Sequence, residues 1–279
     1  DLEGTKAIRD SFGDDLEPPF GIKEAIEKGR LCRYFYYPHI VRLNEEEEED
    51  WKNLTKRIAG SIGSDESSSQ WSEQTKLLLI KRAKILKKAA GKIPLADNVL
   101  SDYYSKGNRW LVYCDDSDQL NSIVSSLREK MDARVLPYHT AMAGDAATTL
   151  RVFSDSGGIV VAIKCLDEGV DIPAADNALI LASSQNPREF IQRRGRVLRT
   201  SKNKSYANIH DAIVVPNNVD STGKASAMLV SEMSRAIEFG QFAENPTIIE
   251  TLKGQLLALG IDVEMTAVEG VEEDDEQND

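Results

Sequence analysis

The amino-acid sequence predicts an α/β protein whose mostly parallel sheet is covered by helices on both faces. From Arg109 onward, short apolar stretches alternate with amphipathic ones, which is the pattern of βαβ units. The apolar stretches suit buried strands, and none approaches the roughly 18 residues of a membrane span. Before Arg109, apolar residues recur at the spacing of an α-helix. The sheet is therefore expected to follow a separate helical segment.

Shifts in composition divide the chain into four expected segments. Residues 1–44 are expected to be a connector, 45–105 a helical block, 106–260 the α/β domain, and 261–279 an acidic, disordered tail. Within the connector, Leu31–Leu43 is rich in Tyr and Val and is expected to be extended.

Within these segments the periodicity places individual elements. Strands are expected at 110–114, 134–138, 159–163, 177–182 and 206–215. Helices are expected at 20–28, 46–58, 72–90, 95–104, 118–131, 146–153, 187–194, 224–239 and 246–257. Ser117 is the expected N-cap of the helix that begins at Asp118.

Composition excludes some classes of function. Hydrophobic residues make up 41% and charged residues 29%, as in ordinary soluble proteins. Three scattered Cys form no CxxC pair, and the three His are equally dispersed, so neither a zinc site nor a disulfide framework is expected. This cysteine usage favours a reducing compartment, and the predicted location is cytoplasmic, with nucleoid association if the source is bacterial.

A net charge of −12 counts against a nucleic-acid-binding protein, because phosphate contacts need Lys and Arg. The distribution weakens that objection. Much of the acid lies in Glu45–Asp50 and Glu264–Asp279, whereas Arg188–Lys204 is strongly basic. Net charge therefore does not describe every surface of the protein.

The strongest chemical signal is the run Gln192–Arg199, at the end of an expected helix. One interpretation is an exposed basic helix face. The spacing favours another, because Gly195 interrupts the helix where Arg196 and Arg199 follow three residues apart. Two guanidinium groups so placed can point at one phosphate and neutralise charge on a transferring γ-phosphoryl group, as an arginine finger does.

A second signal is Val160–Pro173, where a buried strand leads into a loop with Glu168, Gly169 and Asp171. Gly169 permits a tight backbone turn, and Asp171 can accept a hydrogen bond from a ribose hydroxyl. An Asp near a Gly in a loop is also a common turn former, and both interpretations stay open on these residues alone.

The two runs resemble a known family. Leu166–Pro173 and Gln192–Arg199 look like the fifth and sixth motifs of superfamily 2 helicases of the DEAD/DEAH type, within their second RecA-like domain. Trp110–Ser117 resembles the fourth-motif region, and Tyr138–Met142 resembles a segment that touches the nucleic-acid backbone. The resemblance covers about residues 105–215 and extends more weakly to Leu31–Ile58. It is closer to the DNA translocase and restriction-type branch than to DEAD-box RNA helicases.

The resemblance implies roles for individual residues. Arg196 and Arg199 would contact the γ-phosphate across an interdomain cleft, with Gln192 near the same phosphate. The loop residues that would lie at the nucleotide are Glu168, Gly169 and Asp171. The candidates for nucleic-acid contact are His139, Thr140, Lys164 and Ser183, with Ser184 a weaker one. Where many members carry a phosphate-binding Thr in the fifth motif, this chain has Ile163 beside Lys164.

No P-loop is evident in this sequence. Ser221–Lys224 contains Gly-Lys but lacks both the following Ser or Thr and the first Gly of Gly-x4-Gly-Lys-Ser/Thr. Asp115-Asp116 follows a strand without a P-loop upstream, and is interpreted as a polar loop rather than a magnesium-binding pair. No metal site is therefore assigned to this chain. The resemblance implies that ATP and Mg²⁺ are held mainly by a missing first motor domain of the same polypeptide, to which residues 1–44 would connect.

The expected function is the second motor half of an ATP-dependent helicase or translocase, inactive as an ATPase alone, with double-stranded DNA the preferred track and no membrane partner. A non-catalytic nucleic-acid or protein interaction module is the alternative. The paired Arg residues after Gly195 favour the motor-domain hypothesis. A small-molecule transferase is less favoured, because the chain has no Gly-rich phosphate loop.

Overall fold

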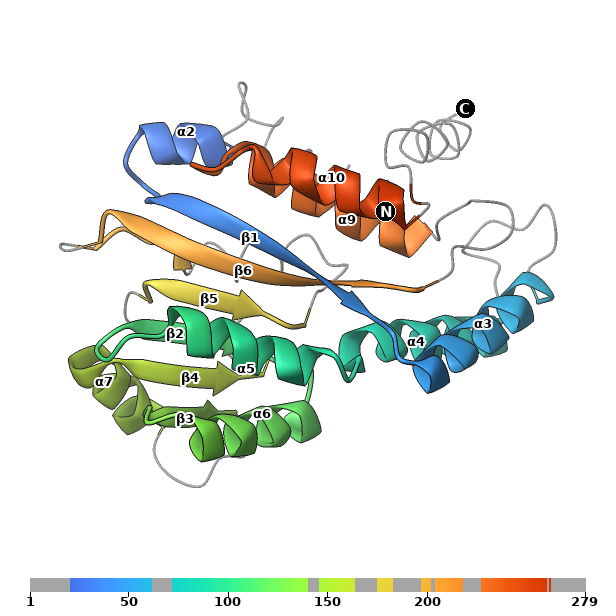
Figure 1. Cartoon of the computed structure of the whole chain (residues 1–279), viewed down its shortest axis with the longest axis horizontal. Helices are drawn as coiled ribbons and strands as arrows, with labels where there is room; N and C mark the ends of the chain where they lie inside the picture. The colour runs from blue at the N-terminus through green and yellow to red at the C-terminus, as the bar shows by residue number, and fades with distance from the viewer. Residues whose placement is uncertain are drawn as a thin grey trace, which may run out of the picture.

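The computed structural model places one parallel sheet at the centre of the molecule (Figure 1). It describes residues 21–61, 72–139, 146–163, 175–182, 197–201, 204–217, 227–259 and 261. In this part of the chain the sheet has six strands in the order β1-β6-β5-β2-β4-β3. The strands are β1 Arg33–Arg42, β2 Arg109–Tyr113, β3 Val135–Tyr138, β4 Gly158–Ala162, β5 Asn177–Ile180 and β6 Tyr206–Val215.

Every neighbouring pair of strands is parallel, so all carboxyl ends lie at one edge of the sheet. Strands covered on both faces need continuous apolar sequences rather than alternating ones. The stretch Gly158–Ala162 shows this, since all five residues of β4 are buried. The expected α/β class with a mostly parallel sheet is confirmed.

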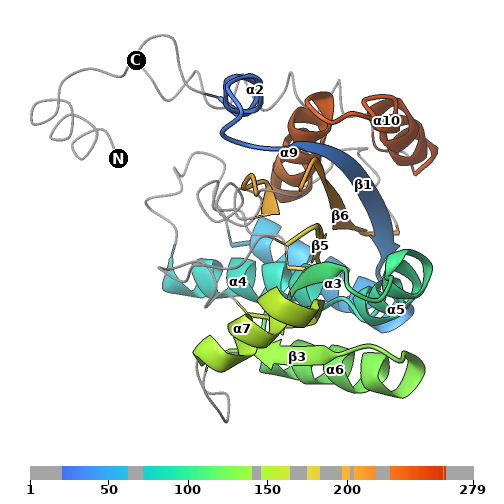
Figure 2. The same cartoon turned by 90° about the vertical axis from the view of Figure 1, so that its left-hand side faces the viewer.

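Helices cover both faces. One face packs against α7 (Ala146–Ser156), α9 (Ala227–Gln241) and α10 (Ile248–Ala258). The other packs against α3 (Glu45–Ala59), α4 (Glu73–Lys88), α5 (Lys92–Tyr103) and α6 (Ser117–Lys130). Figure 2 shows α5 and α6 on the opposite side of the sheet from α7 and α9. A short helix, α2 (Ile22–Glu27), precedes β1. Among the described residues, no helix has the length and apolar character needed to cross a bilayer.

The strand expected as an extended part of the connector is an integral part of the sheet. All ten residues of β1 pair with β6, from Arg33 beside Tyr206 to Arg42 beside Val215. Tyr34 and Tyr36 are fully buried against α9, and the Tyr34 hydroxyl donates to the Phe239 carbonyl at 2.6 Å. Residues 33–42 therefore share a core with the later strands, which a connector would not.

Local capping sets where the helices begin. Asn44 caps α3: its side chain accepts from the Glu47 N–H at 2.9 Å, while the Glu47 carboxylate accepts from the Asn44 N–H at 3.0 Å. The expected cap of α6 was wrong by one residue. Asp116, not Ser117, accepts from the Gln119 N–H, at 3.0 Å, and Ser117 is the first helical residue. Both side chains can cap, and the carboxylate also complements the helix dipole.

A buried histidine pair joins β1, β6 and α5. His39 Nε2 and His210 Nδ1 lie 3.0 Å apart, with their rings stacked at an interplanar angle of 7°. Tyr37 stacks on His210, and Tyr103 of α5 meets the same ring edge-on. Burial, with a smaller contribution from His39, lowers the pKa of His210 to about 3. His210 is therefore neutral at physiological pH.

This pair predicts an acid-dependent loss of stability. The folded-state pKa of His210 lies below the unfolded value of 6.5, so its contribution is complete above pH 6.5 and is lost as the pH falls toward 3. Near pH 5 the loss from this group is about 2 kcal/mol. Urea denaturation at neutral pH and at pH 5 should show a smaller acid loss for His210→Phe than for the wild type. Equal losses would contradict the assignment.

Candidate nucleotide and nucleic-acid interface

The carboxyl edge of the sheet gathers the starts of the loops that the sequence singled out. Because the strands are parallel, each loop leaves the sheet on the same side. The described residues at these strand ends are Asp115 and Asp116 after β2, His139 after β3, Ile163 after β4, Ala182 after β5 and Asn217 after β6.

Three loops that carry expected nucleic-acid contacts begin at this edge. The Ile163 N–H donates to the Tyr138 carbonyl at 3.4 Å, so half-buried His139 lies beside the end of β4. The Ala182 N–H donates to the Tyr113 carbonyl at 3.1 Å, which fixes the end of β5 against β2. The remaining candidates, Thr140, Lys164, Ser183 and Ser184, lie outside the described residues.

The end of the arginine-rich run is held at the opposite edge. Val197 and Leu198 are buried, and the Cys32 N–H donates to the Leu198 carbonyl at 2.8 Å. Arg199 forms an antiparallel bridge with Leu31, just before β1, and its side chain is exposed. Arg199 and His139 therefore lie at opposite edges of the sheet. Arg199 pairs with Leu31, just before β1 at the amino edge, and His139 follows β3 at the carboxyl edge.

The other residues expected to contact the nucleotide lie outside the described residues. They are Glu168, Gly169, Asp171, Gln192 and Arg196.

A buried lysine joins the chain segment that follows the first predicted motif to the end of the second motif. Lys204 is 9% exposed, and its ammonium donates to the Ala175 carbonyl at 2.5 Å and to the Val197 carbonyl. Burial lowers the pKa of Lys204. Ala175 follows the Leu166–Pro173 run, and Val197 follows Arg196, so a single side chain positions both. Sequence reasoning missed this role, because Lys204 looked like one more charge in a basic segment.

A second ion pair fixes the same region. The Arg109 guanidinium donates to both carboxylate oxygens of Asp176, at 3.2 and 3.3 Å. The backbone N–H of Arg109 also donates a hydrogen bond to the Asp176 carboxylate, at 3.3 Å. The start of β5 is thus held to the start of β2.

Asp115 and Asp116 are engaged locally, in agreement with their interpretation as a polar loop. Asp116 caps α6 and pairs with Lys88, while Asp115 lies 3.9 Å from the Lys87 ammonium. Burial alone would raise the Asp116 pKa, but hydrogen bonds from Lys88 and the Gln119 N–H outweigh burial and lower this pKa. Within the described ranges, no group of three or more His, Cys, Asp or Glu could hold a metal ion.

Comparison with protein families identifies this region. The family model of the helicase conserved C-terminal domain matches residues 91–201. Residues 91–201 of this chain are therefore similar to the conserved C-terminal domain of helicases. Both motif runs lie inside the matched residues, whereas β1, α3, α4 and β6 lie outside them.

Solved structures show the same RecA-like α/β fold. The Sulfolobus solfataricus SWI2/SNF2 ATPase core domain is 15% identical, with a TM-score of 0.50 over 86% of this chain and 49% of that one. The C-terminal domain of a SWI2/SNF2 ATPase from the same organism is 13% identical, with a TM-score of 0.47 over 76% of this chain and 98% of that one. The C-terminal part of the Fun30 ATPase domain is 13% identical, with a TM-score of 0.46 over 76% and 90%. A search of curated protein sequences finds no match.

The α/β domain should depend on Lys204 for stability. Lys204→Met keeps an apolar stem but leaves two buried carbonyls without their donor, which should lower the free energy of unfolding by about 1–3 kcal/mol. Chemical denaturation measures this change. Lys106→Met, at an exposed lysine, is the control and should have little effect. A Lys204→Met protein as stable as the wild type would show that the ammonium does not hold these segments.

Proposed function

We propose that this chain is the second motor domain of an ATP-dependent nucleic-acid helicase or translocase. The observation that carries the proposal is the match to the helicase conserved C-terminal domain over residues 91–201, a range that includes both motif runs. A first RecA-like domain of the same polypeptide would hold ATP and Mg²⁺. The proposed track is nucleic acid, with double-stranded DNA preferred on the resemblance of the motifs.

The proposed role of the arginine-rich run is to stabilise charge on the transferring γ-phosphoryl group. Arg196 and Arg199 would supply guanidinium groups to the phosphate oxygens, and Gln192 would hydrogen-bond nearby. Two features support this role: buried Val197 and Leu198 anchor the backbone between the two arginines, and Arg199 itself is exposed. The planar guanidinium fork loses less entropy per hydrogen bond to a phosphate than a flexible donor does.

The proposed role of the loop after β4 is to sense the nucleotide. Gly169 and Asp171, with Glu168, would lie at the nucleotide sugar. Lys204 supports this role, because it ties the end of that loop to Val197 through one ammonium group. A conformational change caused by nucleotide binding or hydrolysis would then be transmitted to both motif runs together.

The proposed nucleic-acid surface is formed by the loops at the carboxyl edge. His139, Thr140, Lys164 and Ser183 come from the ends of three strands that the sheet brings to that edge. Closure of the two domains on ATP would assemble the nucleotide site, and hydrolysis would reopen it. Alternating closure and opening would step the two domains along a phosphate backbone.

The arginine assignment predicts a large catalytic effect. The chain should be joined to its upstream RecA-like domain and assayed for nucleic-acid-stimulated ATP hydrolysis. Arg196→Ala and Arg199→Ala should each lower turnover by about 10³ or more, with folding retained. Arg151→Ala, at an exposed arginine on α7, is the matched control and should keep turnover near the wild-type rate.

Two outcomes would contradict the proposal. Unchanged turnover in both arginine variants would remove the finger assignment and favour a non-catalytic interaction module. Clear ATP hydrolysis by the 279-residue chain alone would mean that this chain itself contains a phosphate-binding site.

A further inference from the structure

Two helices project beyond the carboxyl edge of the sheet. Figure 1 shows α3 and α4 side by side on the side to which the strands point. Both lie outside the residues that match the helicase domain. The last turn of α4 is attached to this edge through two ion pairs, between Lys87 and Asp115 and between Lys88 and Asp116. The projecting pair of helices is therefore fixed to the end of β2, at the edge of the sheet where the strands carrying the expected nucleic-acid contacts also end.

The two helices have opposite charge patterns. Helix α4, with the sequence EQTKLLLIKRAKILKK, has one acidic residue among its many lysines, whereas the first turn of α3 is entirely acidic. In a chain of net charge −12, α4 is a distinctly basic surface. Phosphate backbones are recognised through such surfaces.

Most basic side chains of α4 already have partners within the protein. Lys76 pairs with Glu73 at 3.0 Å, and Lys87 and Lys88 pair with the acids after β2. Arg82 lies over the Trp51 ring at 5.1 Å, which helps to hold α4 against α3. Lys81 and Lys84 differ from these, because both are exposed and no ion pair involves them within the described part of the chain.

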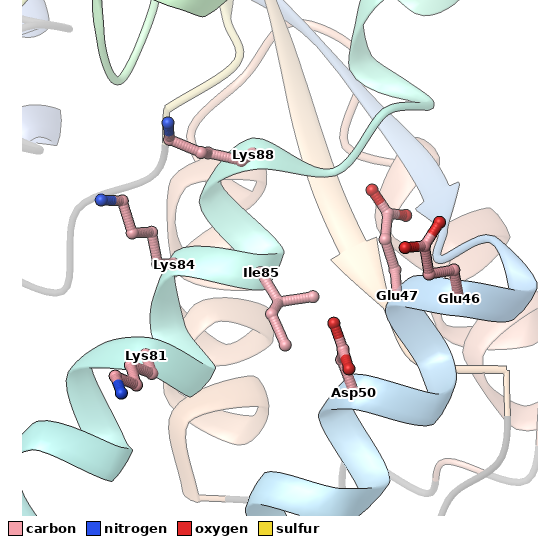
Figure 3. Close-up of a pocket in the computed structure, with 7 residues that line it drawn as sticks. All are labelled: Glu46, Glu47, Asp50, Lys81, Lys84, Ile85 and Lys88. Carbon is pink, nitrogen blue, oxygen red and sulfur yellow. The ribbon is translucent and has the colours of Figure 1, made fainter.

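Within the described residues, no ion pair joins the acidic residues of α3 to these two lysines. A groove of about 330 Å³ separates the helices, lined by Glu46, Glu47 and Asp50 on one side and by Lys81, Lys84 and Lys88 on the other. Figure 3 shows the lysine side chains extending away from the carboxylates, with Ile85 between the two groups. Glu47 is used structurally, since it accepts hydrogen bonds from the Asn44 and Ala90 N–H groups.

We propose that Lys81 and Lys84 bind phosphates of the nucleic acid beyond the carboxyl edge of the sheet. The two lysines are three residues apart on one face of α4, which is about 4.5 Å along the helix axis. Phosphates of one DNA strand are spaced by about 3.4 Å along the duplex axis, so the pair fits neighbouring phosphates. The acidic face of α3 repels phosphate, so the backbone is confined to the α4 side. This inference rests on the proposed function and extends its track outside the matched domain.

Salt-dependent binding tests the inference on the whole 279-residue chain. The probe is a short labelled DNA duplex, and fluorescence anisotropy gives affinity over a range of salt concentrations. Lys81→Gln with Lys84→Gln should weaken binding on the order of tenfold and reduce the slope of log affinity against log salt by about 1.8. Lys23→Gln with Lys106→Gln, at two exposed lysines outside α3 and α4, removes the same charge and should leave the slope unchanged.

A second variant tests whether removing negative charge beside the lysines strengthens DNA binding. Glu46→Gln with Asp50→Gln removes acidic charge beside the lysines without adding a contact, and should tighten binding. Glu47 is left in place because of its capping role. Unchanged affinity in this variant would show that the nucleic acid does not run beside α3 and α4.

The outcomes separate this inference from the proposed function. A wild-type chain that fails to bind DNA even at low salt would overturn the proposed function. Binding that is retained, with an unchanged salt slope, in the Lys81 and Lys84 variant would overturn this inference alone.

Leu77 and Ile80 are 55% and 62% exposed on the same helix, and a protein partner would use them. If their replacement by Ser weakens DNA binding while loss of the lysines does not, the phosphate assignment is wrong.

Discussion

The parallel pairing of β1 with β6 is the interaction on which the rest of this structure depends. It buries Tyr34 and Tyr36 against α9, and it brings His39 against His210. At its amino end, the chain entering β1 holds the end of the arginine-rich run through the Cys32–Leu198 hydrogen bond. At its carboxyl end, β1 leads through Leu43 and the Asn44 cap into α3. One strand thus links two regions that the sequence presents as unrelated.

The two edges of the sheet are stabilised by different kinds of contact. At the amino edge, the Lys204 ammonium and the Arg109–Asp176 pair fix the segments that follow each motif run. At the carboxyl edge, Lys87 and Lys88 fix α4 to the loop after β2. The central strands β2, β4 and β5 are buried on both faces, and close-packed interiors have low compressibility. This arrangement favours rigid-body motion of the whole domain during any nucleotide cycle, rather than bending within it.

Much of the fold could be predicted from the sequence, because it depends on local patterns. The apolar runs at β2, β4 and β6 predicted strands that the structure contains at nearly the same residues. The place of β1 in the sheet could not be predicted, since its partner lies far along the chain and its Tyr-rich sequence also suits an exposed extended segment. Lys204 was missed because only the folded state shows that its ammonium is buried. The predicted N-cap of α6 was wrong by one residue, because neighbouring Asp and Ser side chains can both accept the capping hydrogen bond. Among the predicted site residues, Arg199 and His139 are described and lie at opposite edges, whereas the catalytic roles remain predictions.

The central claim is that Arg196 and Arg199 reach a nucleotide held by a neighbouring RecA-like domain. The most direct measurement is a crystal structure of the two-domain polypeptide with ADP, Mg²⁺ and aluminium fluoride, which imitates the transferring phosphoryl group. In the proposed function, guanidinium nitrogens of both residues lie within about 3 Å of the fluoride ligands. Guanidinium groups held in ion pairs within their own domain, with the fluoride contacted only by the first domain, would contradict it.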